Sequence, residues 1–246
     1  MIRNAVVVGL VLGAAAAGKA DDAKAVVEKG LKACGWDKEK SPCMTWKDSG
    51  KFSGGGMEMT YSGDWAVQLP DKYRFAIKVK FGEMSIDFTH VLNGDKAFES
   101  AAGMTQDVEG EKLKYTKNQV FSMWVQSLAP LLTDPAFKLK DVPGKDEGGK
   151  PTAGVQVDRE GKPPVTLYFD KASGLLVRVD LKTINEFDGW KECTDESHLS
   201  DWKDVGNGVK AFHKLKIVRD GKTMIESDMS EFRRPEKLDA KLFEKP

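Results

Sequence analysis

Few side chains in this 246-residue sequence could carry out catalysis or bind a metal. Its histidines are His90, His198 and His213, and none stands at the spacing of a helical metal pair. No CxxC pair, GxSxG elbow or phosphate-binding glycine loop occurs. Acidic residues are plentiful but scattered, so no acid/base pair can be nominated. The sequence therefore predicts no metal, no cofactor and no catalytic residue, and it favours a protein that is not an enzyme.

The sequence also limits the roles that the histidine and cysteine side chains could have. His90 ends an apolar row and His213 lies within one, where a histidine satisfied inside a sheet is favoured over a ligand. Cys34 and Cys43 either form a disulfide that pins the first helix to the first strand, or stay reduced, because sequence does not supply the Cα geometry. Cys193 is left over, and an odd count argues against a disulfide framework.

The first twenty residues have the layout of a secretory signal. A short basic start precedes an uncharged run from Ala5 to Ala17, and Gly18-Lys19-Ala20 offers small residues where a signal peptidase reads. We expect cleavage after Ala20, which leaves residues 21–246 as one domain; a buried N-terminal helix is the alternative. The run is too short to span a membrane, and no later stretch is apolar enough to do so.

The charge balance excludes some classes of partner. The mature chain would carry 36 Lys and Arg against 38 Asp and Glu, a net formal charge of −2. This balance leaves no basic footprint for nucleic acid and gives no strong attraction to anionic lipid surfaces. With 40% hydrophobic and 31% charged residues, the composition is that of a globular protein with a sizeable core.

The elements that would position a site are mostly strands. Residues 73–81 place five apolar side chains on one face and Arg74, Lys78 and Lys80 on the other, as in an antiparallel sheet wetted on one side. Asn93-Gly94 predicts a hairpin turn. Apolar stripes predict helices over 21–34 and 109–132. We expect nine to eleven strands in one large antiparallel sheet, which would curl rather than stay flat.

Methionine is frequent along the expected apolar face, at Met57, Met59, Met84 and Met104. Because methionine is flexible and polarizable, walls rich in it adapt to varied apolar shapes. One interpretation is a lipid-accommodating cavity between sheet and helix. The other is a plain core in which methionine fills gaps, and the residue pattern alone favours this second interpretation.

A resemblance to a known family favours the cavity interpretation over the plain core. The stretch GDWAVQLPDKYRF from Gly63 to Phe75, followed by the Asn93-Gly94 turn, resembles the outer-membrane lipoprotein-sorting proteins, the LolA/LolB-like periplasmic carriers. The segments LYFDKASGLLV (167–177) and LDAKLF (238–243) look similar to members of the same group. The resemblance implies an unclosed β-barrel of about eleven antiparallel strands with a helical lid and a hydrophobic cavity for acyl chains. Those carriers hold the lid with a buried arginine, a role that is not assigned to Arg74 because it lies on the polar face.

The resemblance implies an exported periplasmic carrier that acts as a monomer. Its partners would be lipid acyl chains or a lipoprotein, held between the curved sheet and the lid helix, with transient contact to envelope membrane proteins. The cavity wall is expected to contain Met57, Met59, Phe75, Ile77, Ile86, Phe88, Val120 and Trp124. One alternative is an envelope interaction or lipid-sensing module on the same fold, and another is an enzyme with an acidic site that no motif marks.

Overall fold

A computed structural model of the chain describes residues 20–36 and 43–246. The predicted signal peptide lies outside these residues, apart from the backbone of Ala20, and stays a prediction. The strands are β1 (Cys43–Gly54), β2 (Met57–Gln68), β3 (Lys72–Phe81), β4 (Met84–Asn93), β5 (Lys96–Ala101), β6 (Met104–Val108), β7 (Lys138–Val142), β8 (Asp146–Glu147), β9 (Lys150–Asp158), β10 (Val165–Asp170), β11 (Leu176–Asn185), β12 (Lys191–Gly206), β13 (Val209–Arg219) and β14 (Lys222–Arg233). The helices are α1 (Ala20–Ala33), α2 (Gly110–Gln126), α3 (Ala129–Thr133) and the short 3₁₀ helix η2 (Ala240–Phe243).

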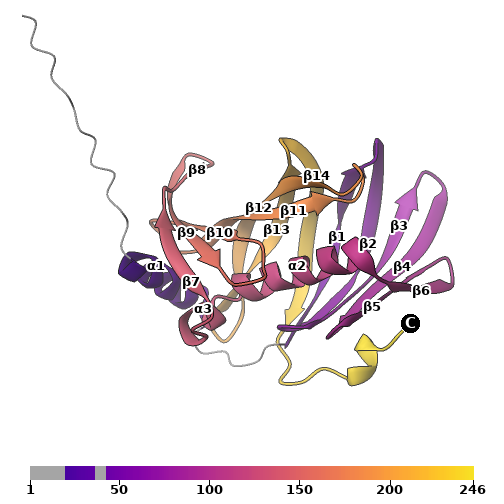
Figure 1. Cartoon of the computed structure of the whole chain (residues 1–246), viewed down its shortest axis with the longest axis horizontal. Coiled ribbons are helices and arrows are strands. Elements are labelled where there is room, and N and C mark those ends of the chain that lie inside the picture. The colour runs from indigo at the N-terminus through magenta and orange to yellow at the C-terminus, as the bar shows by residue number, and fades with distance from the viewer. Residues whose placement is uncertain (1–19, 37–42) are drawn as a thin grey trace, which may run out of the picture.

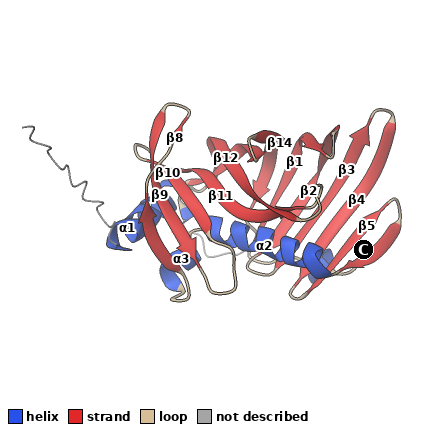
Figure 2. Cartoon of the chain, turned by 45° about the horizontal axis from the view of Figure 1, so that its top comes forward, coloured by secondary structure: helices blue, strands red, loops and turns tan. Residues whose placement is uncertain are grey.

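The strands form one antiparallel sheet of fourteen strands, in the order β6-β5-β4-β3-β2-β1-β14-β13-β12-β11-β10-β9-β7, with β8 paired to β9. The sheet is strongly curved and unclosed, and α2 runs across its concave face (Figures 1 and 2). The expected mainly β, single-sheet architecture is confirmed, but the expected strand count of about eleven is too low. Residues 141–150, rich in glycine and proline, hold the end of β7 and all of β8, and the Gly148-Gly149 turn joins β8 to the start of β9.

Both predicted helices are present, but the second is interrupted. Helix α1 buries Ala23, Val27 and Leu31, the stripe that its sequence spacing predicts. The region 109–132 forms α2 and α3 rather than one helix, with Leu128 at a φ of +62° between them. Pro130 lies in the first turn of α3. Proline in a helix interior removes a hydrogen bond and clashes with the preceding turn, so α2 ends before it.

The core is divided into three clusters of buried side chains. The first lies at one end of the concave face, where α1, α3 and the C-terminal part of α2 pack on β9 to β12. The second lies beneath the rest of α2, against β1 to β5 and β14. The third is on the opposite face, where Leu238 and Phe243 of the C-terminal segment cover Ala66 and Val91. None of the helices in the described part of the chain is long and apolar enough to cross a membrane.

Candidate functional site

The concave face of β1 to β4 carries a row of aromatic rings. The rings of Trp46 and Trp65 stack with centroids 5.3 Å apart, and Phe75 stacks on Trp65 at 4.9 Å. Phe88 continues the row on β4, 5.6 Å from Phe75. These residues meet because Trp46 is opposite Trp65, and Trp65 opposite Phe75, in the antiparallel register. The row forms a broad apolar floor across four strands.

Helix α2 covers one half of this floor. Val120 of α2 is buried in the same cluster as Trp46, Val67 and Leu92, and Leu113 packs at its edge. Val67, Leu92 and Val120 are at most 2% exposed, so the space directly beneath the helix is filled. A chain-like ligand could enter that half only if α2 moved. The other half of the floor, toward the β1–β2 and β3–β4 turns, is not covered in this way.

The structure brings together most of the expected cavity wall. The register places Met57, Met59, Phe75, Ile77, Ile86 and Phe88 on the same face of β2 to β4. Met59, Phe75, Ile77 and Phe88 are half-buried there, whereas Met57 and Ile86 are 48% and 45% exposed and lie at the rim. Val120 faces the same floor, but Trp124 belongs to the other cluster, with Phe121 and Phe137. The role of the eight expected residues as a cavity wall stays a prediction.

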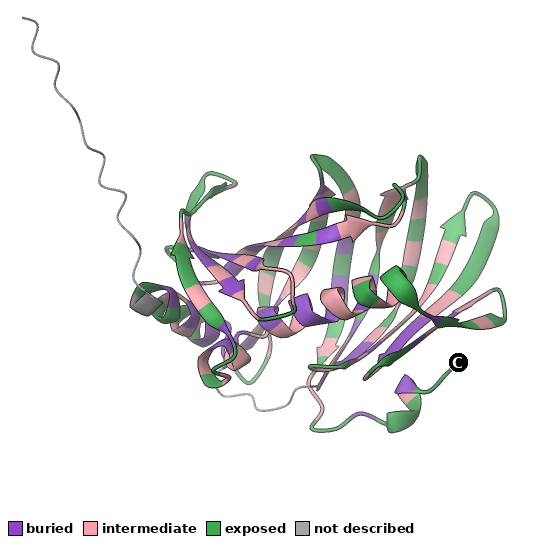
Figure 3. Ribbon diagram, in the orientation of Figure 1, coloured by how far each residue is buried: buried purple, intermediate pink, exposed green. Residues whose placement is uncertain are grey.

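Exposed apolar side chains mark the turns around the open half. They come from the ends of neighbouring hairpins, which Figure 3 shows as largely exposed. The set consists of Met57, Phe81, Met84, Ile86, Met104, Phe187 and Trp190. Phe187, in the β11–β12 turn, lies 5.4 Å from Phe52 at the end of β1, so that turn overhangs the floor. An apolar rim of this kind suits a binding or contact surface.

Polar side chains tie α2 to the sheet at its N-terminal half. Lys112 donates a hydrogen bond to Glu99 on β5 at 2.5 Å, and Gln106 on β6 donates to the same carboxylate. Nε2 of His90 lies 3.2 Å from the hydroxyl of Thr116 on α2. Burial lowers the pKa of His90 to about 4, so this imidazole is neutral at pH 7. These contacts hold the helix without closing the apolar surface completely.

A buried arginine makes a second connection to α2. Arg219 of β13 donates two hydrogen bonds to Asp195 of β12, at 2.7 and 2.9 Å, and one to Asn185 at 3.2 Å. Tyr115 of α2 hydrogen-bonds the same guanidinium, and burial raises the pKa of Tyr115 to about 12. Arg219 was not singled out in the sequence analysis, and it directly precedes the turn between β13 and β14. Arg74 is on the opposite face from Phe75, as the alternation predicts.

A buried carboxyl group interrupts the apolar floor on β1. Asp48 is 5% exposed, accepts a hydrogen bond from the hydroxyl of Tyr61 at 3.4 Å, and is hydrogen-bonded by Ser227. Burial raises the pKa of Asp48 to about 6. Glu186, near Arg219, also has a raised pKa from burial, but its charged neighbours are Lys112, Arg219 and Glu99, and Asp48 is not among them. Asp48 and Glu186 are thus two buried acidic groups with raised pKa values, each with different charged neighbours.

The remaining histidine and cysteine side chains were also considered as metal ligands or nucleophiles. Within the described residues, no group of three histidine, cysteine or acidic side chains could hold a metal. His198 pairs with Glu147 at 2.6 Å, on the face opposite the floor. Cys34 and Cys43 are both buried, with Cys34 Sγ 3.3 Å from the carbonyl oxygen of Leu31, and their pairing stays a prediction. Cys193 is a buried thiol, and burial raises its pKa to about 11, so it is a poor nucleophile.

The arrangement of sheet, helix and floor can be compared with known structures. The chain superimposes on a LolA superfamily protein from Nitrosomonas europaea with a TM-score of 0.59 and 10% identity, covering 91% of this chain and 97% of that one. The chain has the LolA-like fold. An outer membrane lipoprotein-sorting protein domain from Vibrio parahaemolyticus gives a TM-score of 0.57 at 9% identity, covering 92% and 97% of the two chains.

A DUF1329 family protein from Desulfovibrio piger is similar to the same degree, with a TM-score of 0.57, 12% identity and coverage of 90% and 97%. No protein-family model and no curated protein sequence matches the chain. The resemblance to lipoprotein-sorting proteins that the sequence suggested is therefore confirmed at the level of the fold. Because the sequence identity is 9–12%, the comparison establishes the fold alone.

Proposed function

We propose that this protein is an exported, periplasmic carrier that binds acyl chains, free or as the anchor of a lipoprotein, on the concave face of its sheet. One observation carries the proposal. On β2 to β4, the half-buried floor of Met59, Phe75, Ile77 and Phe88 extends from the packed cluster beneath α2 to the exposed apolar rim, and Asp48 lies beside it on β1. The similarity to a LolA superfamily protein and a lipoprotein-sorting domain supports it.

Binding would be driven by removal of apolar surface from water. Each methylene group of a chain that is buried against the floor contributes roughly 0.8 kcal/mol. A chain would first lie on the open half of the floor, since the space beneath α2 is filled. Deeper binding would then require α2 to swing away from Val67 and Leu92, which breaks the contacts of Lys112, Tyr115 and Thr116 with the sheet. Helix α2 is thus the proposed lid.

The alternative is an envelope interaction or lipid-sensing module that does not ferry cargo. The tightly packed side chains beneath α2 favour this second candidate. In that case the floor would be an ordinary core, and the exposed rim of Met57, Phe81 and Met84 would be the contact surface for a partner.

One experiment separates the two. Protein exported and purified without detergent is extracted with organic solvent for mass spectrometry, and uptake of a fluorescent fatty acid is then measured. The carrier proposal predicts a co-purifying lipid and measurable uptake. Phe75→Asp places a charge in the aromatic row and should reduce uptake at least tenfold. The matched control is Lys78→Asp, three residues along β3 on the opposite face, which should leave uptake unchanged.

A clean extract with no uptake by the natural sequence would contradict the carrier proposal. Equal loss of uptake in both variants would also count against it, because a charge on the outer face should not disturb the floor. In either case the interaction module would become the better account.

A further inference from the structure

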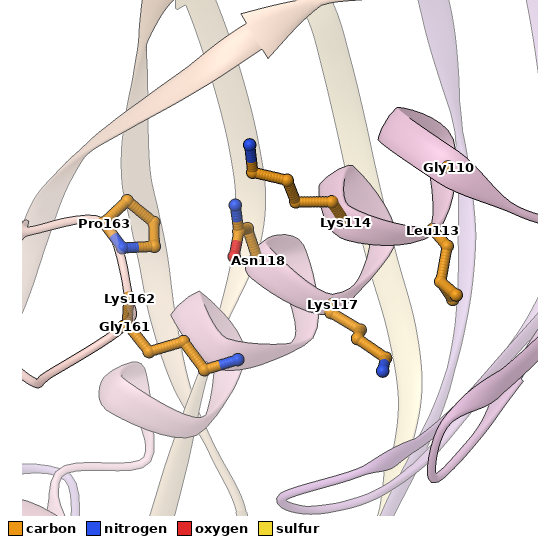
Figure 4. Close-up of a pocket in the computed structure, with 8 residues that line it drawn as sticks. All are labelled: Gly110, Leu113, Lys114, Lys117, Asn118, Gly161, Lys162 and Pro163. Atoms are coloured by element: carbon orange, nitrogen blue, oxygen red, sulfur yellow. The ribbon is translucent and has the colours of Figure 1, made fainter.

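A hollow of about 410 Å³ lies between α2 and the loop 159–164, which joins β9 to β10 (Figure 4). Three of its eight lining residues are lysines, Lys114 and Lys117 from the helix and Lys162 from the loop, and none is acidic. Figure 4 shows Asn118 and Lys162 in the space between helix and loop, with Lys114 above and Lys117 below in this view. The hollow is therefore lined by hydrogen-bond donors that carry positive charge.

The loop is fixed in place by Arg159. Its guanidinium donates a hydrogen bond to Asp134 at 2.7 Å and lies over the rings of Trp124 and Phe137, 4.8 and 4.6 Å from their centroids. The backbone N–H of Lys162 donates to the carbonyl oxygen of Arg159 at 3.1 Å and closes the turn. Cation–π contacts and a charge-assisted hydrogen bond together restrain this segment. The hollow is thus a preformed feature of the fold.

The positive charge at the hollow is weakly compensated. Lys117 pairs with Asp95, whose side chain is 98% exposed, and Lys114 pairs with the exposed Glu111 at 3.5 Å. Exposed pairs of this kind contribute little and exchange readily. Lys162 has no ion pair with any residue in the described part of the chain. Its ammonium lies over the ring of Phe121, 5.6 Å from the centroid, and burial and then the positive charges of Lys117 and Arg159 lower its pKa. An anion beside Lys162 would favour its charged form.

The hollow also adjoins the proposed lipid surface. Leu113 lines it and at the same time packs at the edge of the cluster beneath α2. A ligand could therefore extend around the N-terminal half of α2, with its apolar chain on the floor and its charged head group in the hollow. The near-neutral charge of the whole chain does not oppose this, because the three lysines act at short range.

We infer that this hollow binds the anionic head group, a phosphate or carboxylate, of an amphiphile whose chain lies on the open half of the floor. Lys114 and Lys162 supply charge and hydrogen bonds, and the Asn118 amide supplies a further donor. Lys117, whose amine points away from the loop in Figure 4 and pairs with Asp95, adds positive charge only. This inference rests on the proposed function and adds the class of cargo, an anionic rather than a neutral lipid.

The test uses three probes that separate the chain from the head group: decyl phosphate, decanol and inorganic phosphate. Binding of each to the full exported protein is measured by isothermal titration calorimetry. Decyl phosphate should bind roughly tenfold or more tightly than decanol, as expected for one or two hydrogen bonds to a charged group. Lys162→Gln should remove most of that difference and leave decanol binding unchanged. Lys78→Gln, the same change on the outer face of β3, should alter neither.

Equal affinity for decyl phosphate and decanol, unaffected by Lys162→Gln, would overturn the head-group site while leaving chain binding intact. Equal affinity for decyl phosphate and inorganic phosphate would show a site for a free anion, which also overturns it. Failure of every probe to bind would refute the proposed function, and the head-group site with it. Lys162 is half-buried in a turn outside the three core clusters, so its substitution should not prevent folding, and circular dichroism checks this.

Discussion

Replacing Asp48 with asparagine should stabilise this protein, because the native fold buries an acidic side chain where water cannot solvate its charge. Asp48 is 5% exposed on the concave face of β1. Its Oδ2 accepts a hydrogen bond from Tyr61, while Oδ1 has no hydrogen-bond partner among the described residues. Burial is the main cause of the raised pKa, and hydrogen bonds from Ser227 and Tyr61 offset only part of it.

The magnitude follows from the shift. The pKa of Asp48 rises from 3.8 to about 6 on folding. This corresponds to roughly 3 kcal/mol of destabilisation once the group is ionised in both states. The native state holds its proton longer than the unfolded state does, so stability falls as the pH rises from about 4 to 6 and the penalty is complete above that. Asparagine removes the charge but keeps an acceptor, so we expect a gain of about 1–3 kcal/mol at pH 7.5.

Urea denaturation followed by tryptophan fluorescence measures this difference. The advantage of Asp48→Asn over the natural sequence should shrink to roughly 0.5 kcal/mol at pH 4, since the native carboxyl is then neutral. Asp64→Asn is the matched control, because Asp64 is exposed on the outer face of β2, and it should change stability by less than about 0.5 kcal/mol. An Asp48→Asn variant that is no more stable at pH 7.5, with a difference independent of pH, would refute the reasoning.

Two further predictions concern the contact between α2 and the sheet. Burial lowers the pKa of His90 to about 4, so the stability that neutral His90 contributes is present above pH 6.5 and is lost as the pH falls toward 4. His90→Gln should therefore weaken the pH dependence of the unfolding free energy between pH 6.5 and 4. An unchanged pH dependence in that range would contradict the prediction. Val120→Ala leaves a cavity beneath α2 and should lower the free energy of unfolding by about 2 kcal/mol. Val79→Ala, at a half-buried position on β3, should lower it by less than half of that. Equal losses in urea denaturation would show that α2 does not cover the floor.

Local patterns in the sequence determined much of the fold. The alternation from Tyr73 to Phe81 placed Phe75 and Ile77 on the apolar face and Lys78 on the other, and the register agrees. The predicted Asn93-Gly94 turn occurs between β4 and β5. These features are readable because side-chain alternation and positive-φ turns are properties of a few adjacent residues.

Only the tertiary structure decided which of those residues meet. Trp124 was expected beside Phe75, but its contacts with Phe121 and Phe137 place it in the other cluster. Arg219 and Asp195 meet because they are paired across β12 and β13, and Tyr115 joins them because α2 packs on this face of the sheet. Lys162 and Lys117, also far apart in sequence, line one hollow because the β9–β10 loop lies beside α2. Sequence records the face that a side chain occupies, whereas the curvature of a long sheet, fixed by packing over all its strands, decides what that face encloses.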